Sequence, residues 1–326
     1  MAKLPGAGEL MTLTRRRSLM LGLTGLSLAA VNWHGISGAY AAEPLRIGDQ
    51  KGGARSLLKA AGIGDNASSP LQWSLFAGAP MLIQALTAKA IDAGVIGDAP
   101  LVFAQSGSDE ITAISGVQTD GTTTAVVVQP DSTVRSVADL KGKRIATLKG
   151  QTGHYLVLAA LKAAGLHATD VRFVFIPPVA AKLALQTGAV DAWATWGPYI
   201  SDAKVSNGAR EIVNGGQLMS GLSYVIATRE ALEKNRAGLV NYVQQLKAGH
   251  QWMQTHTDDY AKVWAEEVGL SLPVAKDVVR TMRGTIIPLT PDIVAKQQQV
   301  SDFMTETGMI SGKLNAQAVM DGSFTF

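Results

Sequence analysis

Cysteine is absent from the 326-residue chain, and its absence excludes disulfide bonds, thiolate chemistry and a lipid attached to an amino-terminal cysteine. A basic surplus is also missing from most of the chain. Residues 1–41 carry four basic side chains against one acidic one, namely Lys3, Arg15, Arg16 and Arg17 against Glu9. The formal net charge of +3 therefore falls to 0 beyond residue 41. Because affinity for nucleic acid requires a surplus of Lys and Arg in the folded part, we expect no nucleic-acid partner.

An apolar run of membrane-spanning length is missing too. Residues 21–31 are apolar but fall short of the ~20 residues that a spanning helix needs, and glycine interrupts them. They follow the basic residues 14–20 and precede the small residues 39–41, the order that a signal peptidase recognises. This order predicts an export signal over residues 1–41, cleaved near Ala41, and a periplasmic mature protein. The consecutive arginines resemble a twin-arginine signal, and the general secretory route stays equally open.

The rest of the chain alternates short apolar runs with helical patterns, which is typical of an α/β fold. Strands are expected over residues 45–48, 71–76, 91–96, 111–117, 144–148 and 171–176. Helices are expected over residues 54–61, 79–89, 155–164 and 179–186, and from residue 236 onward the pattern is mostly helical. Residues 97–100 are expected to form a turn between two strands.

An internal repeat indicates two similar halves. Residues 85–93 (ALTAKAIDA) are echoed by residues 184–192 (ALQTGAVDA), and each copy predicts a helix, a tight turn and a strand. Chance recurrence in an alanine-rich chain is the alternative. Two α/β lobes that face one another would hold a ligand between the loops at the carboxyl ends of their strands.

Several short motifs, weak one by one, occur in a specific order over nearly the whole mature chain. They are residues 47–52 (IGDQKG), 76–80 (FAGAP), 97–100 (GDAP), 149–154 (KGQTGH) and 190–199 (VDAWATWGPY), with PLT at 288–290 and QQ at 297–298. In these segments the chain resembles the aliphatic sulfonate, taurine and nitrate-type binding proteins of ABC importers. The resemblance implies a monomeric receptor that captures an aliphatic sulfonate and delivers it to a membrane permease for sulfur uptake.

The resemblance also implies a type II periplasmic binding protein fold. This fold has two lobes, each a mixed sheet flanked by helices, joined by two crossover strands. Lobe 1 is expected over residues 43–125 and 222–326, and lobe 2 over residues 126–221. Residues 124–129 and 224–228 are the expected crossovers.

The anion is expected to bind at loops that lie between a strand and the helix after it. Helix amino termini carry backbone N–H groups without acceptors and a positive partial charge, and small residues let an oxyanion approach them. Gln50 and His154 are expected to donate hydrogen bonds, and Trp196 and Tyr224 to form an apolar wall for the ligand's tail. The expected ligand-binding residues are Gln50, Lys51, Gly52, Gly78, Ala79, Pro80, Gly97, Asp98, Gln151, Thr152, Gly153, His154, Trp196 and Tyr224. The alternative is that the glycines serve turns and caps and the aromatic rings pack in the core, as expected for Trp193, Trp252 and Trp264.

Three positions depart from the family pattern and leave the identity of the anion open. Asp49 stands where an aromatic residue is common, Gly197 where an aspartate is common, and residues 179–180 are Val-Ala where Ala-Asp is frequent. Taurine, nitrate, an aryl sulfonate or a sulfate ester therefore remain alternative ligands. An enzyme on the same fold is the competing function. It is disfavoured because related enzymes depend on cysteine, because the five histidines are scattered without metal-ligand spacing, and because no nucleophile accompanies Asp98. We expect no cofactor and no metal.

Overall fold

The computed structural model describes residues 43–64 and 70–326, and these residues form one compact unit. The expected export signal at residues 1–41 lies outside the described residues. Within the described part, none of the helices is both long and apolar enough to cross a membrane.

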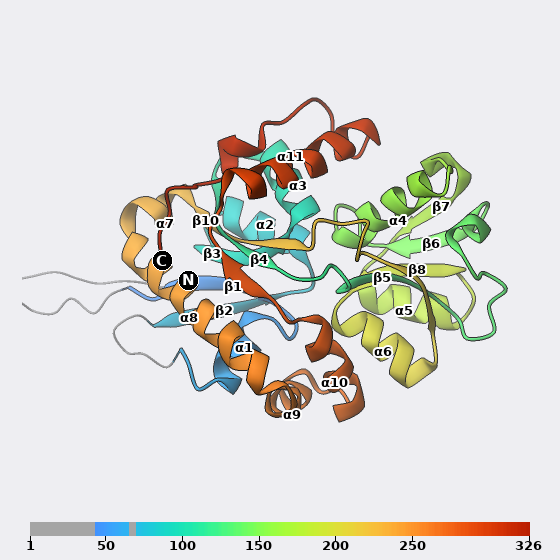
Figure 1. Ribbon diagram of the computed structural model, residues 1–326, viewed down its shortest axis with the longest axis horizontal. Coiled ribbons are helices and arrows are strands. Elements are labelled where there is room, and N and C mark those ends of the chain that lie inside the picture. The colour runs from blue at the N-terminus through green and yellow to red at the C-terminus, as the bar shows by residue number, and fades with distance from the viewer. Residues whose placement is uncertain (1–42, 65–69) are drawn as a thin grey trace, which may run out of the picture. The chain divides into compact units, whose positions relative to one another are not determined.

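A six-stranded mixed sheet, the first sheet, forms one half of the fold (Figure 1). Its strand order is β11 (Thr285–Ile287), β4 (Ile111–Gln118), β10 (Leu222–Thr228), β3 (Ala93–Gly97), β1 (Leu45–Gln50) and β2 (Leu71–Phe76). β1 pairs in parallel with β2 and β3, whereas β10 runs antiparallel to β3 and β4. The parallel strands all end at the same edge, so Gln50, Phe76 and Gly97 and the segments that follow them lie near one another there.

Helices bury both faces of the first sheet, because its strands carry apolar side chains on both sides. The helices α2 (Ala79–Thr87), α3 (Asp98–Gly107) and α11 (Pro291–Glu306) pack on one face. The helices α1 (Ala54–Ala60), α7 (Arg229–Lys234) and α8 (Arg236–Thr255) pack on the other. A further cluster joins α1 and α8 to α9 (Thr257–Val268) and α10 (Leu272–Thr281).

A five-stranded sheet, the second sheet, repeats this arrangement on a smaller scale (Figure 1). Its order is β7 (Arg172–Phe175), β6 (Arg144–Thr147), β8 (Ala192–Trp196), β5 (Thr124–Val128) and β9 (Arg210–Asn214). One face packs against α4 (Thr152–Ala163), and the other packs against α5 (Pro178–Gln186) and α6 (Pro198–Asn207). Short 3-10 turns lie at Val137–Leu140, Ala168–Asp170 and Ala316–Val319.

The sequence repeat corresponds to a structural repeat. Asp92 accepts a hydrogen bond from the backbone N–H of Arg46 at 2.8 Å, and Asp191 accepts the equivalent bond from Arg144 at 2.7 Å. In both copies the arginine side chain also pairs with that aspartate. The same ion pair therefore fastens the helix–turn–strand unit to β1 in the first sheet and to β6 in the second, which confirms the interpretation of two similar α/β halves.

Two expectations about connections are wrong. Residues 97–100 do not form a turn between strands, because α3 begins at Asp98 and Pro100 lies in its first turn, where its missing N–H is not needed. The expected crossover segments 124–129 and 224–228 are not crossings either: β5 lies wholly in the second sheet and β10 wholly in the first. The chain passes between the sheets at residues 119–123 and 215–221.

Candidate functional site

The starts of α2 and α4 meet between the two sheets, and the Trp196 side chain at the end of β8 reaches the same place. A Cβ atom placed on Gly78, the residue before α2, would lie 3.4 Å from Nε2 of Gln151 and 3.7 Å from Cη2 of Trp196. Gln151 precedes α4, and Trp196 ends β8, just before α6. Gly78 is buried, and its missing side chain permits this close approach of segments from different sheets.

A second contact joins β3 to α4. A Cβ atom on Gly97 would lie only 2.6 Å from Cγ2 of Thr152, the first residue of α4. The hydroxyl of Thr152 also lies 3.3 Å from the hydroxyl of Thr124 at the start of β5. The structure thus brings together five of the expected residues, which we call the junction: Gly78, Gly97, Gln151, Thr152 and Trp196.

The helix amino termini near the junction differ in whether an acidic side chain neutralises their positive partial charge. The first turns of α2, α4 and α6 contain no acidic residue, and small or amide residues precede them. As the first two residues of α4, Thr152 and Gly153 have backbone N–H groups without an intrahelical acceptor. At α2 the same holds for Ala79, whereas Pro80 has no N–H to offer. The positive ends of these helices therefore favour an anion at the junction.

At α3, by contrast, the protein supplies its own carboxylate. Asp98 is only 1% exposed and accepts hydrogen bonds from the N–H of Ala99 at 2.7 Å and the hydroxyl of Ser220 at 2.6 Å. Its backbone carbonyl accepts a further bond from Gln297 at 2.9 Å. Burial raises the pKa of Asp98, and these hydrogen bonds to its carboxyl group partly offset that effect. Asp98 therefore anchors α3 to the crossing segment that contains Ser220.

The same occurs at α1, where sequence reasoning missed the role of Asp49. Its two carboxylate oxygens accept from the N–H groups of Ala54 at 3.0 Å and Arg55 at 2.9 Å. Burial raises the pKa of Asp49 to about 6. The start of α1 is thus occupied by a protein carboxylate, so Gly52 and Lys51 do not present a vacant helix terminus.

Gly52 is shaped by packing. A Cβ atom there would collide with the indole of Trp264, and that indole donates a hydrogen bond to the Gly52 carbonyl at 2.9 Å. Trp264 is fully buried, so the expectation that it packs is confirmed. Lys51 next to it is exposed.

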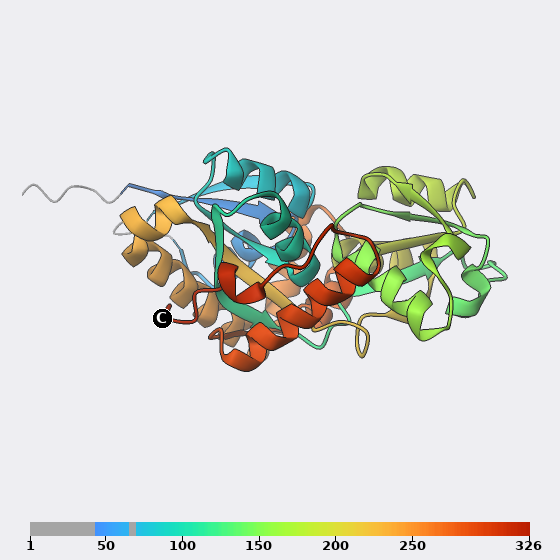
Figure 2. The ribbon, with the colours of Figure 1, turned by 90° about the horizontal axis from the view of Figure 1, so that it is seen from above.

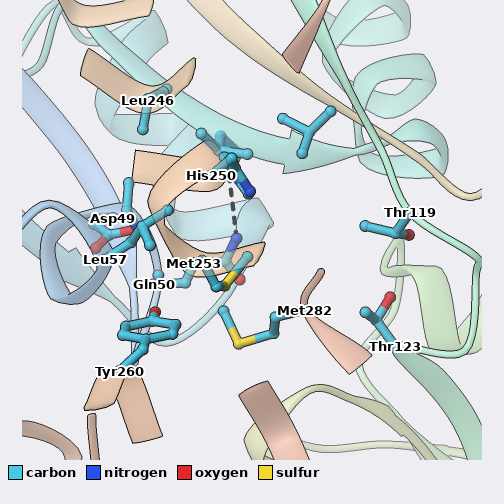
Figure 3. A pocket seen from close by; sticks show the side chains of 14 residues that line it. Asp49, Gln50, Leu57, Thr119, Thr123, Leu246, His250, Met253, Tyr260 and Met282 are labelled. Carbon is cyan, nitrogen blue, oxygen red and sulfur yellow. Dashed lines mark hydrogen bonds between the residues drawn. The ribbon is translucent and has the colours of Figure 1, made fainter. Parts of the chain in front are cut away.

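A cavity of about 180 Å³ lies on the α8 side of the first sheet (Figure 3). Gln50, one of the expected residues, lines it and donates from Nε2 to the carbonyl of Val95 at 3.3 Å. The other polar lining comes from Asp49, Thr119, Thr123, His250 and Tyr260, and the apolar lining includes Leu57, Val117, Leu246, Met253 and Met282. Sequence reasoning missed His250 and Tyr260, because only the fold brings α8 and α9 next to the end of β1.

Three expected residues occupy packing positions. The His154 ring packs edge-on against the stacked rings of Phe173 and Phe175, with centroids 4.9 and 5.0 Å away. Its burial and the nearby Lys149 lower its pKa to about 4, so the imidazole is neutral near pH 7.

Tyr224 is 0% exposed and belongs to the core of the first sheet. A Cβ atom on Gly153 would lie 2.7 Å from the Ala194 carbonyl oxygen, so Gly153 allows α4 to pack on β8. Trp193 is buried in the core of the second sheet, as expected.

Among the described residues, no cluster of His, Asp and Glu side chains is suited to hold a metal ion.

The chain is similar to proteins of known class. Residues 77–259 match the family model described as NMT1/THI5 like. A putative aliphatic sulfonates-binding protein of Escherichia coli (strain K12) is 31% identical over 304 residues, which cover 92% of this chain and 95% of the relative. The chain belongs to the NMT1/THI5-like family.

Solved structures agree with this membership. The alkanesulfonate-binding protein SsuA from Xanthomonas axonopodis pv. citri, bound to MOPS, is 27% identical, with a TM-score of 0.80 over 85% of this chain and 98% of that one. The periplasmic aliphatic sulphonate binding protein SsuA from Escherichia coli is 31% identical, with a TM-score of 0.77 over 85% of this chain and 91% of that one. This NMT1/THI5-like chain therefore has the two-sheet fold of periplasmic binding proteins, and the junction lies between its two sheets.

Proposed function

We propose that this protein is the exported solute-binding component of an ABC importer, and that it binds the sulfonate group of an aliphatic sulfonate at the junction. The supporting observation is the meeting of helix starts from both sheets without acidic residues in their first turns. Each such terminus contributes about 0.3–1 kcal/mol to anion binding. With hydrogen bonds added, several of them supply a substantial part of the roughly 8 kcal/mol of a micromolar receptor.

The relatives support the rest of the proposal. Their printed names describe proteins that bind alkanesulfonates or aliphatic sulfonates, one of them named as periplasmic, and none of these three names describes an enzyme. We propose the same for this chain: export through the signal at residues 1–41, binding without catalysis, and delivery to a membrane permease. In cell fractions, the mature protein should then appear in the periplasm with its amino terminus near residue 42.

The substrate class is tested by ligand-dependent stability. A ligand that binds only the folded protein raises its stability with the logarithm of ligand concentration over Kd. We expect alkanesulfonates to raise the melting temperature progressively, and nitrate, bicarbonate and sulfate esters to raise it less. An effect confined to the inorganic anions would contradict the sulfonate assignment.

The location of the site is tested at Thr152. Thr152→Asp places a carboxylate at the first residue of α4, where it favours the helix but repels a bound anion. Thr152→Asn is the matched control, because it is of similar size and carries no charge. We expect calorimetry to show a loss of sulfonate affinity of about tenfold or more for Thr152→Asp relative to Thr152→Asn, with both variants folded. Equal affinity in the two variants would place the anion elsewhere.

A further inference from the structure

The cavity beside β1 contains a buried carboxylate without a cationic partner. Asp49 is 4% exposed, and none of the salt bridges among the described residues includes it; the charge of Arg55 lowers its pKa only as the smallest of several effects. The two N–H groups at the start of α1 bond to it, but burial still raises its pKa to about 6. Gly53 makes room for it, since a Cβ atom there would collide with Oδ1 of Asp49. The carboxylate therefore retains capacity for a positively charged neighbour.

Further polar atoms around the cavity also lack partners. In the described part of the chain, no hydrogen bond satisfies Oε1 of Gln50, Nδ1 of His250 or the hydroxyl of Tyr260. All three residues line the cavity together with Asp49 (Figure 3). Each of these atoms can accept a hydrogen bond, and the carboxylate and the amide oxygen can only accept. Buried acceptors of this kind call for a group that carries several donors.

The apolar residues of the cavity wall indicate what the rest of the bound molecule must be. Leu57, Val117, Met253 and Met282 make most of the wall apolar. A volume of about 180 Å³ suits a short alkyl chain rather than an aromatic system of several rings. The chemistry that fits both the acceptors and the wall is a short alkyl chain that ends in a primary ammonium group.

The cavity adjoins the junction. Thr123 lines the cavity, and its carbonyl accepts a hydrogen bond at 2.8 Å from the N–H of Gly197, the residue before α6. The next residue, Thr124, contacts Thr152 of the junction at 3.3 Å. On the first sheet, Gln50 is aligned with Phe76, two residues before Gly78. The cavity therefore borders the junction through Thr123 on one side and Gln50 on the other.

We propose that Asp49 determines specificity by binding a terminal ammonium group on the ligand's tail, so that the protein prefers aminoalkanesulfonates to alkanesulfonates of equal length. This inference rests on the proposed function, in which the sulfonate group lies at the junction. The carboxylate of Asp49 attracts a positively charged tail and so favours binding of an aminoalkanesulfonate. An alkanesulfonate would instead bury this carboxylate against a methyl group, which weakens its binding.

The first test compares two ligands of equal length on the unmodified mature protein. Aminopropanesulfonate and butanesulfonate differ only in an ammonium group in place of a methyl group. We expect calorimetry near neutral pH to show that the amine binds about tenfold or more tightly, equivalent to about 1.4 kcal/mol. Butanesulfonate binding equally or more tightly would overturn the inference while leaving the proposed function intact. If neither ligand binds, the proposed function itself fails.

The second test removes the charge. Asp49→Asn keeps the size of the side chain, and thermal unfolding checks that α1 remains capped. We expect this variant to lose about tenfold affinity for aminopropanesulfonate and to change that for butanesulfonate by no more than about twofold. An unchanged ratio of the two affinities would overturn the role of Asp49. If Asp49→Asn fails to fold, Tyr260→Phe is the alternative variant. We expect it to lower the affinity for aminopropanesulfonate by less than Asp49→Asn would, and to leave the affinity for butanesulfonate unchanged. An unchanged ratio of the two affinities would count against this binding site.

Discussion

Asp49 influences folding stability as well as the cavity, because its pKa differs between the folded and unfolded chain. Burial raises the folded pKa from the ordinary value of 3.8 to about 6. Between pH 3.8 and about pH 6 the folded protein holds a proton on Asp49 that the unfolded chain releases. The contribution of Asp49 to the free energy of unfolding is therefore greatest below the unfolded pKa and is lost as pH rises through the folded pKa. The groups near this carboxyl are Arg55, Tyr242, Tyr260 and His250.

We therefore expect the wild type to lose roughly 2–3 kcal/mol of unfolding free energy relative to Asp49→Asn between about pH 4 and about pH 7. Burial lowers the pKa of His250 to about 4 and acts in the opposite direction, but that histidine is present in both proteins and cancels in the difference. Denaturant unfolding of both proteins across this range measures the effect. A constant difference would show that Asp49 titrates normally.

The missing side chain of Gly153 should matter for packing. A methyl group there would lie 2.7 Å from the Ala194 carbonyl, so Gly153→Ala should lower the free energy of unfolding by about 1–3 kcal/mol. Gly107→Ala at the end of α3 is a matched control, because a Cβ atom there meets no atom within 4 Å and alanine favours helices. Equal stabilities of the two variants in denaturant unfolding would argue against a tight contact between α4 and β8.

At the scale of elements, α6 and α10 connect the two sheets. The hydroxyl of Ser201 on α6 donates to Oδ2 of Asp277 on α10 at 2.7 Å, and Lys204 lies 4.0 Å from the same oxygen. A bond that exists only when the sheets are in contact stabilises the arrangement in which both can hold one ligand. Its loss should therefore weaken binding at a distance from the site.

We expect Asp277→Ala to lower sulfonate affinity by about two- to tenfold in calorimetry, within the range for a partly exposed polar contact. Asp258→Ala is the control, since Asp258 pairs with Lys276 between α9 and α10 and bridges no second sheet. Similar affinities for these two variants would mean that the α6–α10 contact does not favour the binding arrangement.

The sequence predicts elements well where the pattern is periodic or repeated. The strands β1, β2 and β4, the helices α2 and α5, and the repeat with Asp92 and Asp191 are found as expected, whereas α4 begins at Thr152, three residues before its expected start. α3 was missed because its first residues are also turn formers, and β9 because all five of its residues are half-buried, with no alternation to detect. The cavity could not be predicted, because Asp49 and Tyr260 become neighbours only through the fold.

At the scale of the whole molecule, several contacts hold the two sheets together. Besides α6 and α10, the Tyr155 ring on α4 meets Phe303 on α11 with centroids 5.0 Å apart, and Lys162 pairs with Glu306 at 2.7 Å. Figure 2 shows α11 extending from the first sheet toward α4. Ligand exchange requires some of these contacts to open, and the crossing segments 119–123 and 215–221 contain glycines suited to such a hinge, among them Gly121 and Gly221 with positive φ angles.

A disulfide between α6 and α10 tests this motion directly, and the absence of native cysteines makes the design free of competing thiols. The double variant Ser201→Cys with Asp277→Cys replaces two side chains whose oxygens are 2.7 Å apart. Once oxidised, it should hold the sheets in contact, so sulfonate added afterwards should associate at least about tenfold more slowly, and sulfonate added beforehand should be released more slowly. Reduction should restore both rates. If the oxidised protein exchanges ligand as fast as the reduced one, entry to the junction does not require α6 and α10 to separate.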